Sequence, residues 1–126
     1  MAFEKFITPK RGGAGKYDTP HVIISRSYIV INEKASEQIG DAFNYVVLHF
    51  DKETHSIGFW FWKERVLDSY SLCKKNQRYR NCFLINGRAF SKRYEIFKLI
   101  DQIGKNAFPL VQDGNNKDFY IAILKK

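Results

Sequence analysis

Few residues of the chain have the types and spacing that catalysis or metal binding needs. The three histidines, His21, His49 and His55, fall in expected strands or at a turn, and none has a helical histidine neighbour three or four residues away. No serine lies in a Gly-x-Ser-x-Gly elbow. Tyr17 stands where a phosphate-binding loop ending at Lys16 would need serine or threonine. We therefore expect no enzyme, no metal site and no cofactor.

The two cysteines, Cys73 and Cys82, have a spacing that fits neither a CxxC redox pair nor a four-ligand zinc site. In a hairpin centred between Gln77 and Arg78 their thiols would face each other across the strands. That arrangement allows a disulfide, but two buried, reduced side chains are the favoured reading. Because no stretch approaches the roughly 18 apolar residues that span a bilayer, we expect a cytoplasmic protein with no membrane partner.

Positive charge is concentrated in one part of the chain. The formal net charge is +8, and the segment from Ser69 to Tyr94 holds seven basic residues and no acidic one. Such a segment favours a polyanion over a merely solubilising role. Within it, the stretch from Lys74 to Asn81 is expected to form a basic hairpin, and a two-stranded ribbon of this kind fits the major groove of DNA. The residues expected to contact nucleic acid are Lys74, Lys75, Asn76, Gln77, Arg78, Arg80, Arg88, Lys92 and Arg93, with Lys10, Arg11, Lys16 and Arg26 adding phosphate contacts.

Both faces of the expected strand at residues 56–62 carry aromatic side chains. Strand alternation puts Ile57, Phe59 and Phe61 on one face, which we assign to the core. Trp60 and Trp62 then lie on the other face, where they could stack on bases or bury in a subunit interface. We favour the interface, which makes a homo-oligomer, at least a dimer, the expected state. An assembly module without any nucleic-acid role is the alternative function.

The elements that must position these residues fall into two similar halves. Residues 1–20 are expected to form a flexible basic arm, and residues 21–126 a single domain. Residues 21–25 and 28–32 form an expected hairpin, followed by a helix from Glu33 to Ile39 with Asn32 as its N-cap and Gly40 as its stop. Residues 45–50 and 56–62 give a second hairpin.

The second half repeats the order ββαββ. Residues 68–73 and 79–86 form an expected hairpin, a helix follows from Ala89 to Ile103, and residues 108–112 pair with 117–124 around a turn. The repeats span about 21–64 and 67–126. The predicted fold is thus α+β and β-rich, with two ββαββ units related by a pseudo-twofold and closed into a barrel-like core. Its expected core residues are Val22, Ile24, Ile29, Ile31, Ile39, Val47, Leu48, Ile57, Phe59, Phe61, Leu84, Ile96, Leu99, Ile100, Ile103, Leu110, Ile121 and Ile123.

The run from Tyr28 to Gly40, followed by a strand, a turn and another strand, resembles the swapped-hairpin DNA-binding domain of AbrB and MazE proteins. Tandem copies in one chain resemble MraZ. Asn32 stands where that family usually has proline, and Asp41-Ala42 where it has Gly-Asp. The resemblance implies an intertwined, swapped-hairpin fold and a double-stranded-DNA-binding protein that acts as a transcriptional regulator.

Overall fold

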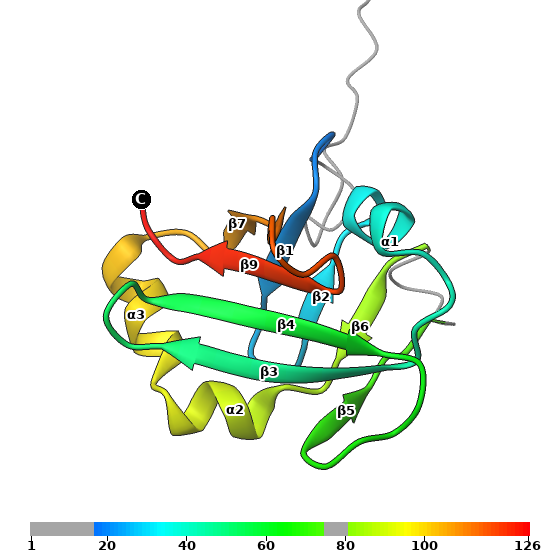
Figure 1. Cartoon of the computed structure of the whole chain (residues 1–126). Coiled ribbons are helices and arrows are strands. Elements are labelled where there is room, and N and C mark those ends of the chain that lie inside the picture. The colour runs from blue at the N-terminus through cyan, green and yellow to red at the C-terminus, as the bar shows by residue number, and fades with distance from the viewer. Residues whose placement is uncertain (1–16, 75–80) are drawn as a thin grey trace, which may run out of the picture.

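Two antiparallel sheets form the framework of the protein, as Figure 1 shows for a computed structural model that describes residues 17–74 and 81–126. The four-stranded sheet has the order β6 (Phe83–Ile85), β2 (Ile29–Ile31), β1 (His21–Ile24) and β7 (Ala107–Pro109). The five-stranded sheet has the order β5 (Ser69–Ser71), β3 (Tyr45–Asp51), β4 (Ser56–Trp62), β9 (Phe119–Ile123) and β8 (Val111–Gln112). The expected α+β, strand-rich class is therefore confirmed.

The main core fills the space between the two sheets. Strand β4 contributes Ile57, Phe59 and Phe61 to it, and all three are buried, as alternation predicts. Leu48, Leu99, Ile100 and Ile103 are partly buried against this core. The other expected residues that are buried in this core are Val22, Ile24, Ile29, Ile31, Ile39, Ile96 and Leu110. Leu84 is also buried, but in a separate smaller cluster with Ile23, Val30, Cys82 and Ala107.

Three expected core residues lie elsewhere, because adjacent strand residues point to opposite faces of a sheet. In β9 the inward positions belong to Tyr120 and Ala122, so Ile121 is only half-buried and Ile123 is 44% exposed. In β3 the inward residue is Val46, and Val47 turns to the outer face. In a continuous apolar run, the sequence does not reveal which of the two alternating sets of side chains faces the core. The core prediction was wrong at these three positions.

Helix α1 (Glu33–Ile39) begins and ends where the sequence predicts. The Asn32 Oδ1 atom accepts a hydrogen bond from the Ala35 N–H at 2.9 Å, which is the expected N-cap. Gly40 ends the helix at φ 86°, a backbone conformation that favours glycine. The same Asn32 side chain accepts from the His21 N–H at 3.1 Å and donates to the Thr19 carbonyl at 2.9 Å. One buried amide therefore joins the start of β1 to the start of α1.

The second half contains two helices where one was expected. Helices α2 (Arg88–Arg93) and α3 (Ile96–Ile103) are separated by Tyr94 and Glu95, and Glu95 has a left-handed backbone with φ 53°. The break lets Phe90 of α2 and Ile96 of α3 both reach the main core. Apolar periodicity across residues 89–103 does not reveal this change of direction, so the single helix was wrong.

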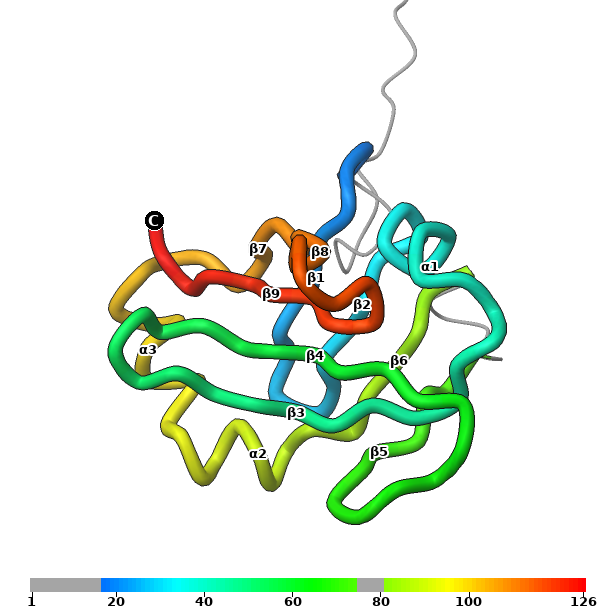
Figure 2. The backbone as a smooth tube through the Cα atoms, viewed as in Figure 1, coloured from blue at the N-terminus to red at the C-terminus, as the bar shows by residue number. Residues whose placement is uncertain are grey.

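Strand pairing in the second half differs from the expected hairpin over residues 68–86. Among the described residues, the two predicted strands of this hairpin pair with each other only at the bridge between Cys73 and Leu84. Strand β5 pairs instead with β3, where Ser71 lies opposite Tyr45. The predicted pairing of residues 108–112 with 117–124 is confirmed only for β8 and β9, where Val111 pairs with Ile121 and Gln112 with Tyr120 (Figure 2). Phe108 and Pro109 belong to β7, which pairs with β1 in the four-stranded sheet, so the prediction was wrong for them. Residues 75–80 of the basic hairpin and 1–16 of the basic arm lie outside the described residues.

No helix in residues 17–74 and 81–126 combines the length and apolar character that crossing a membrane requires.

Replacing Asn32 with alanine should lower the free energy of unfolding by about 1–3 kcal/mol. The substitution removes the N-cap and leaves the His21 N–H and the Thr19 carbonyl without that buried partner. Denaturant unfolding measures the change. The control is Asn86→Ala, because Asn86 is exposed, lies one residue before the N-cap Gly87 of α2 and should change stability by less than about 0.5 kcal/mol. Equal losses in the two variants would contradict the capping role.

Candidate functional site

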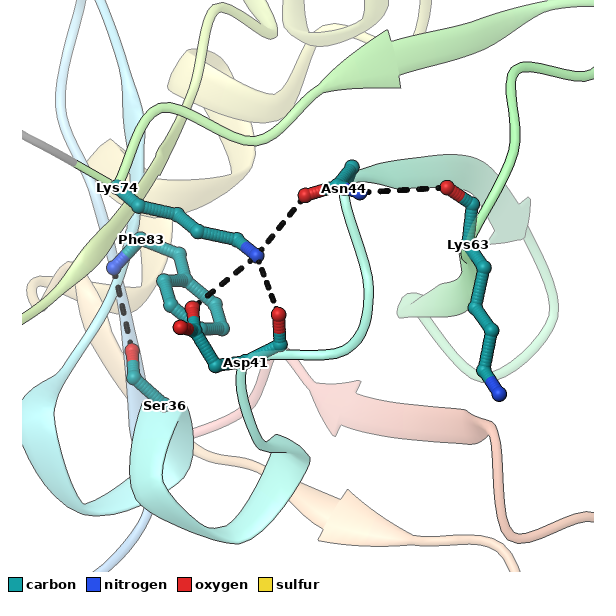
Figure 3. A network of polar contacts seen from close by, with 6 residues as sticks. All are labelled: Ser36, Asp41, Asn44, Lys63, Lys74 and Phe83. Atoms are coloured by element: carbon teal, nitrogen blue, oxygen red, sulfur yellow. Dashed lines mark hydrogen bonds and ion pairs between the residues drawn. The ribbon is translucent and has the colours of Figure 1, made fainter.

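Lys74, the first residue of the expected basic hairpin, is held by polar contacts with Asp41 and Asn44 (Figure 3). Its Nζ atom donates to the Asp41 carbonyl oxygen at 2.9 Å and to Asn44 Oδ1 at 3.1 Å, and it lies 3.2 Å from the Asp41 carboxylate. The ammonium group also sits 5.6 Å from the centre of the Phe83 ring. These contacts link the segment after β5 to the loop between α1 and β3.

The Lys74 side chain is only 20% exposed and its ammonium group already contacts Asp41 and Asn44, so it is poorly placed to bind a phosphate. The hairpin residues Lys75, Asn76, Gln77, Arg78 and Arg80 lie outside the described residues, as do Lys10, Arg11 and Lys16 of the arm. Among the expected nucleic-acid contacts, the structure therefore places Lys74, Arg26, Arg88, Lys92 and Arg93.

The four exposed cations of that set gather around α2. Arg88 and Lys92 lie one helical turn apart on α2, and Arg26 comes from the turn between β1 and β2. Together with Asn86 and Phe97 these three residues line a hollow of about 990 Å³. The turn of a hairpin and a helix that are far apart in the sequence thus contribute to one basic surface.

A second hollow of about 650 Å³ adjoins the first, because Lys92 lines both. Arg93 completes the α2 contribution, Lys98 comes from α3, and Lys52 and His55 come from the turn between β3 and β4. Its apolar lining is Phe50, Tyr94 and Leu99. We call the residues around both hollows the α2 cationic surface: Arg26, Lys52, Arg88, Lys92, Arg93 and Lys98.

Lys52 and Lys98 were missed from the sequence. Each lies in a segment that also carries acidic residues, so local charge does not distinguish them. They join the surface because Phe50, at the end of β3, packs against Phe90 and Tyr94 and holds the β3–β4 turn beside α2. Within the described lining of both hollows, Glu95 is the one acidic side chain.

The second candidate surface is the outer face of the five-stranded sheet. In the register of the strands, Trp60 stands between Val47 and Phe119, and Trp62 stands opposite Tyr45. Ile121 stands next to Val111, whose side chain is 62% exposed. We call this set the aromatic face: Tyr45, Val47, Trp60, Trp62, Val111, Phe119, Ile121 and Ile123.

Contacts within the aromatic face leave both tryptophans half-buried. The Trp60 and Trp62 rings are 4.9 Å apart between centres, and the Phe119 ring covers Gly58 so closely that a Cβ there would lie 2.4 Å from it. The indole N–H of Trp62 is buried, and no hydrogen-bond acceptor meets it in the described part of the chain. The face is therefore ordered, with one polar group unsatisfied.

The cysteines are not bridged, and they occupy different environments. Cys73 is exposed, while Cys82 is buried at the outer side of the four-stranded sheet. Burial, with a smaller contribution from the nearby Glu33 carboxylate, raises the pKa of the Cys82 thiol to about 11. The expectation of two buried thiols was correct for Cys82 and wrong for Cys73. Nor do the described residues bring three or more histidine, cysteine or acidic side chains together as metal ligands.

The chain matches no protein-family model, no curated protein and no solved structure. Its function must be argued from these two surfaces.

Lys74→Ala should destabilise the fold by about 1–2 kcal/mol, because two hydrogen bonds from a largely covered ammonium are lost while Asp41 stays hydrated. Lys34→Ala is the matched control. Lys34 pairs with Glu37 at 3.9 Å on an exposed helix face, so its loss should cost less than about 0.5 kcal/mol. Chemical denaturation of both variants tests the assignment, and equal stabilities would refute it.

Cys82 should resist alkylation in the folded protein near pH 8, because a buried thiol with a pKa of about 11 is almost entirely protonated there. In a Cys73→Ser variant, mass spectrometry after a maleimide pulse should detect no adduct until denaturant is added. Rapid labelling of the native variant would show that Cys82 is accessible.

Proposed function

We propose that this protein binds nucleic acid, double-stranded DNA in particular, through the α2 cationic surface. The observation that carries the proposal is the convergence of six exposed cations from four separate segments around two adjoining hollows with one acidic residue. A surface that only improved solubility would interleave both signs of charge. Cations gathered on one side instead favour contact with the regularly spaced phosphates of a polyanion.

The geometry suits contacts to the backbone of a duplex. Arg88 and Lys92 project from successive turns of α2, and the guanidinium groups of Arg88 and Arg93 can each bind a phosphate through two hydrogen bonds. Residues 75–80, expected to lie in a basic hairpin, follow Lys74 in the sequence, and we propose that they read base edges while α2 holds the phosphates.

We further propose the finer fold that the resemblance implies: a single domain of two ββαββ repeats, related by a pseudo-twofold and of swapped-hairpin type. The order β1, β2, α1, β3, β4 and the caps Asn32 and Gly40 support it in the first half. A cytoplasmic transcriptional regulator without catalytic activity is the role that accords with this fold and with binding at the α2 cationic surface.

The double substitution Arg88→Glu and Arg93→Glu should weaken binding to any duplex and flatten its salt dependence. Each phosphate contact contributes about 0.9 to the log–log slope, so the slope should fall by about 2. Fluorescence anisotropy at several salt concentrations measures it. The control, Lys125→Glu with Lys126→Glu, changes the net charge equally at the chain end and should keep the wild-type slope. An unchanged slope in the α2 variant would remove this surface from the binding site.

A second candidate function is assembly through the aromatic face. The exposure of the apolar side chains of Val111 and Ile123 favours it, since covering them with a second copy stabilises a dimer. This is the interface role predicted for Trp60 and Trp62, and it is compatible with binding at the α2 cationic surface.

Val111→Asp with Ile123→Asp should convert a dimer into a monomer at micromolar concentration, because two carboxylates would have to be buried in the interface. Sedimentation velocity distinguishes the two states. Leu67→Asp is the control, since Leu67 is 88% exposed outside the aromatic face and should leave the dimer intact. A wild-type monomer would eliminate this candidate.

A further inference from the structure

We propose that the 650 Å³ hollow between the β3–β4 turn, α2 and α3 takes an unpaired nucleotide, with its base on the aromatic lining and its phosphates on the surrounding cations. This inference rests on the proposed nucleic-acid function and names the form of nucleic acid that one part of the α2 cationic surface accepts. The volume is within the range of small-ligand pockets.

The aromatic lining supplies a stacking surface. The Phe50 and Tyr94 ring centres are 5.0 Å apart at 33°, and both side chains are half-buried, so their positions are fixed by packing. The Arg93 guanidinium lies 5.6 Å from the centre of the Tyr94 ring. Because Arg93 is exposed, it can move to cover a base that stacks on Tyr94.

Cations from three elements line the same hollow. Lys92 comes from α2, Lys98 from α3 and Lys52 from the β3–β4 turn. An unpaired nucleotide in a strand has a phosphate on each side, so cations from different elements can bind both phosphates while the base stacks on the aromatic lining. An isolated phosphate would contact the cations but not the aromatic side chains, so the aromatic lining favours a ligand that also carries a base.

The polar groups of the same lining fit the edge of a base better than they fit a phosphate. The Glu95 carboxylate repels a phosphate but can accept a hydrogen bond from a base N–H, such as the ring N3–H of thymine or an exocyclic amino group, and the Gln102 amide can both donate and accept. Glu95 and His55, which both line the hollow, have left-handed backbones at φ 53° and 52°. Their carbonyl oxygens accept from the Leu99 N–H at 3.2 Å and the Leu124 N–H at 2.8 Å, which holds the two walls in place.

The test compares two labelled oligonucleotides of about 12 nucleotides, oligothymidylate and a strand of the same length made of abasic residues. Both have the same phosphates, and one has no bases. Anisotropy titrations of the full chain should give about tenfold tighter binding of oligothymidylate. Tyr94→Leu should abolish that difference. Tyr45→Leu, on the aromatic face, is the control and should keep the difference.

The outcomes separate this inference from the proposed function. Equal, salt-dependent affinities of wild type for both strands would overturn the nucleotide site without contradicting the proposed duplex binding, which the salt titration on duplex DNA tests separately. A base-dependent difference that survives in Tyr94→Leu would place the bases elsewhere and would also overturn it. Binding of neither strand, and of no duplex at low salt, would refute both proposals. The comparison of the two strands uses the wild-type chain, so it decides the matter even if Tyr94→Leu fails to fold.

Discussion

The two-residue alternation of β4 is the constraint on which the rest of this structure depends. Ile57, Phe59 and Phe61 point inward and are buried between the sheets, which commits Gly58, Trp60 and Trp62 to the outside. A slip of one residue in the register would exchange the core for the aromatic face, so the buried side fixes the exposed one. The absence of a side chain at Gly58 gives the Phe119 ring its place against the strand. One strand thus determines both the packing of the interior and the chemistry of one outer surface.

Basic residues have two roles in this protein: some hold the fold together and others stand exposed on one surface. Residues with different roles lie close together in the sequence, so their positions in the chain do not distinguish the roles. Lys74 holds the α1–β3 loop through Asp41 and Asn44, whereas Lys92, eighteen positions later, stands exposed between two hollows. The difference lies in the partners each ammonium meets. Carbonyl and carboxylate oxygens contact the first, while the second lines two hollows together with other cations. Exposed cations on one surface attract an anion, which makes that surface a better candidate for function than the charge count of the segment alone.

The first half of the fold follows from local signals, and the second half does not. The hairpins at residues 21–31 and 45–62 and the helix from Glu33 to Ile39 are bounded by turns and caps that lie next to them in the sequence. The break at Glu95 and the pairing of β5 with β3 depend on contacts with distant strands. The candidate site has the same division. The basic residues of α2 are visible in the sequence, while Lys52 and Lys98 become part of the surface only through the packing of Phe50 on Phe90 and Tyr94.

The placement of the two surfaces has a geometric consequence. Helices α2 and α3 pack on the inner side of β3, through Phe50 and Leu48, whereas the aromatic face lies on the outer side of the same strand. Two copies joined through their aromatic faces would direct their cationic surfaces away from each other. Such a dimer would have two binding surfaces that face opposite directions. It could bind two separate polyanion segments, or two distant segments of one polyanion with a loop between them. Binding the first stretch would raise the local concentration of the second, so that weak individual contacts could bridge distant segments.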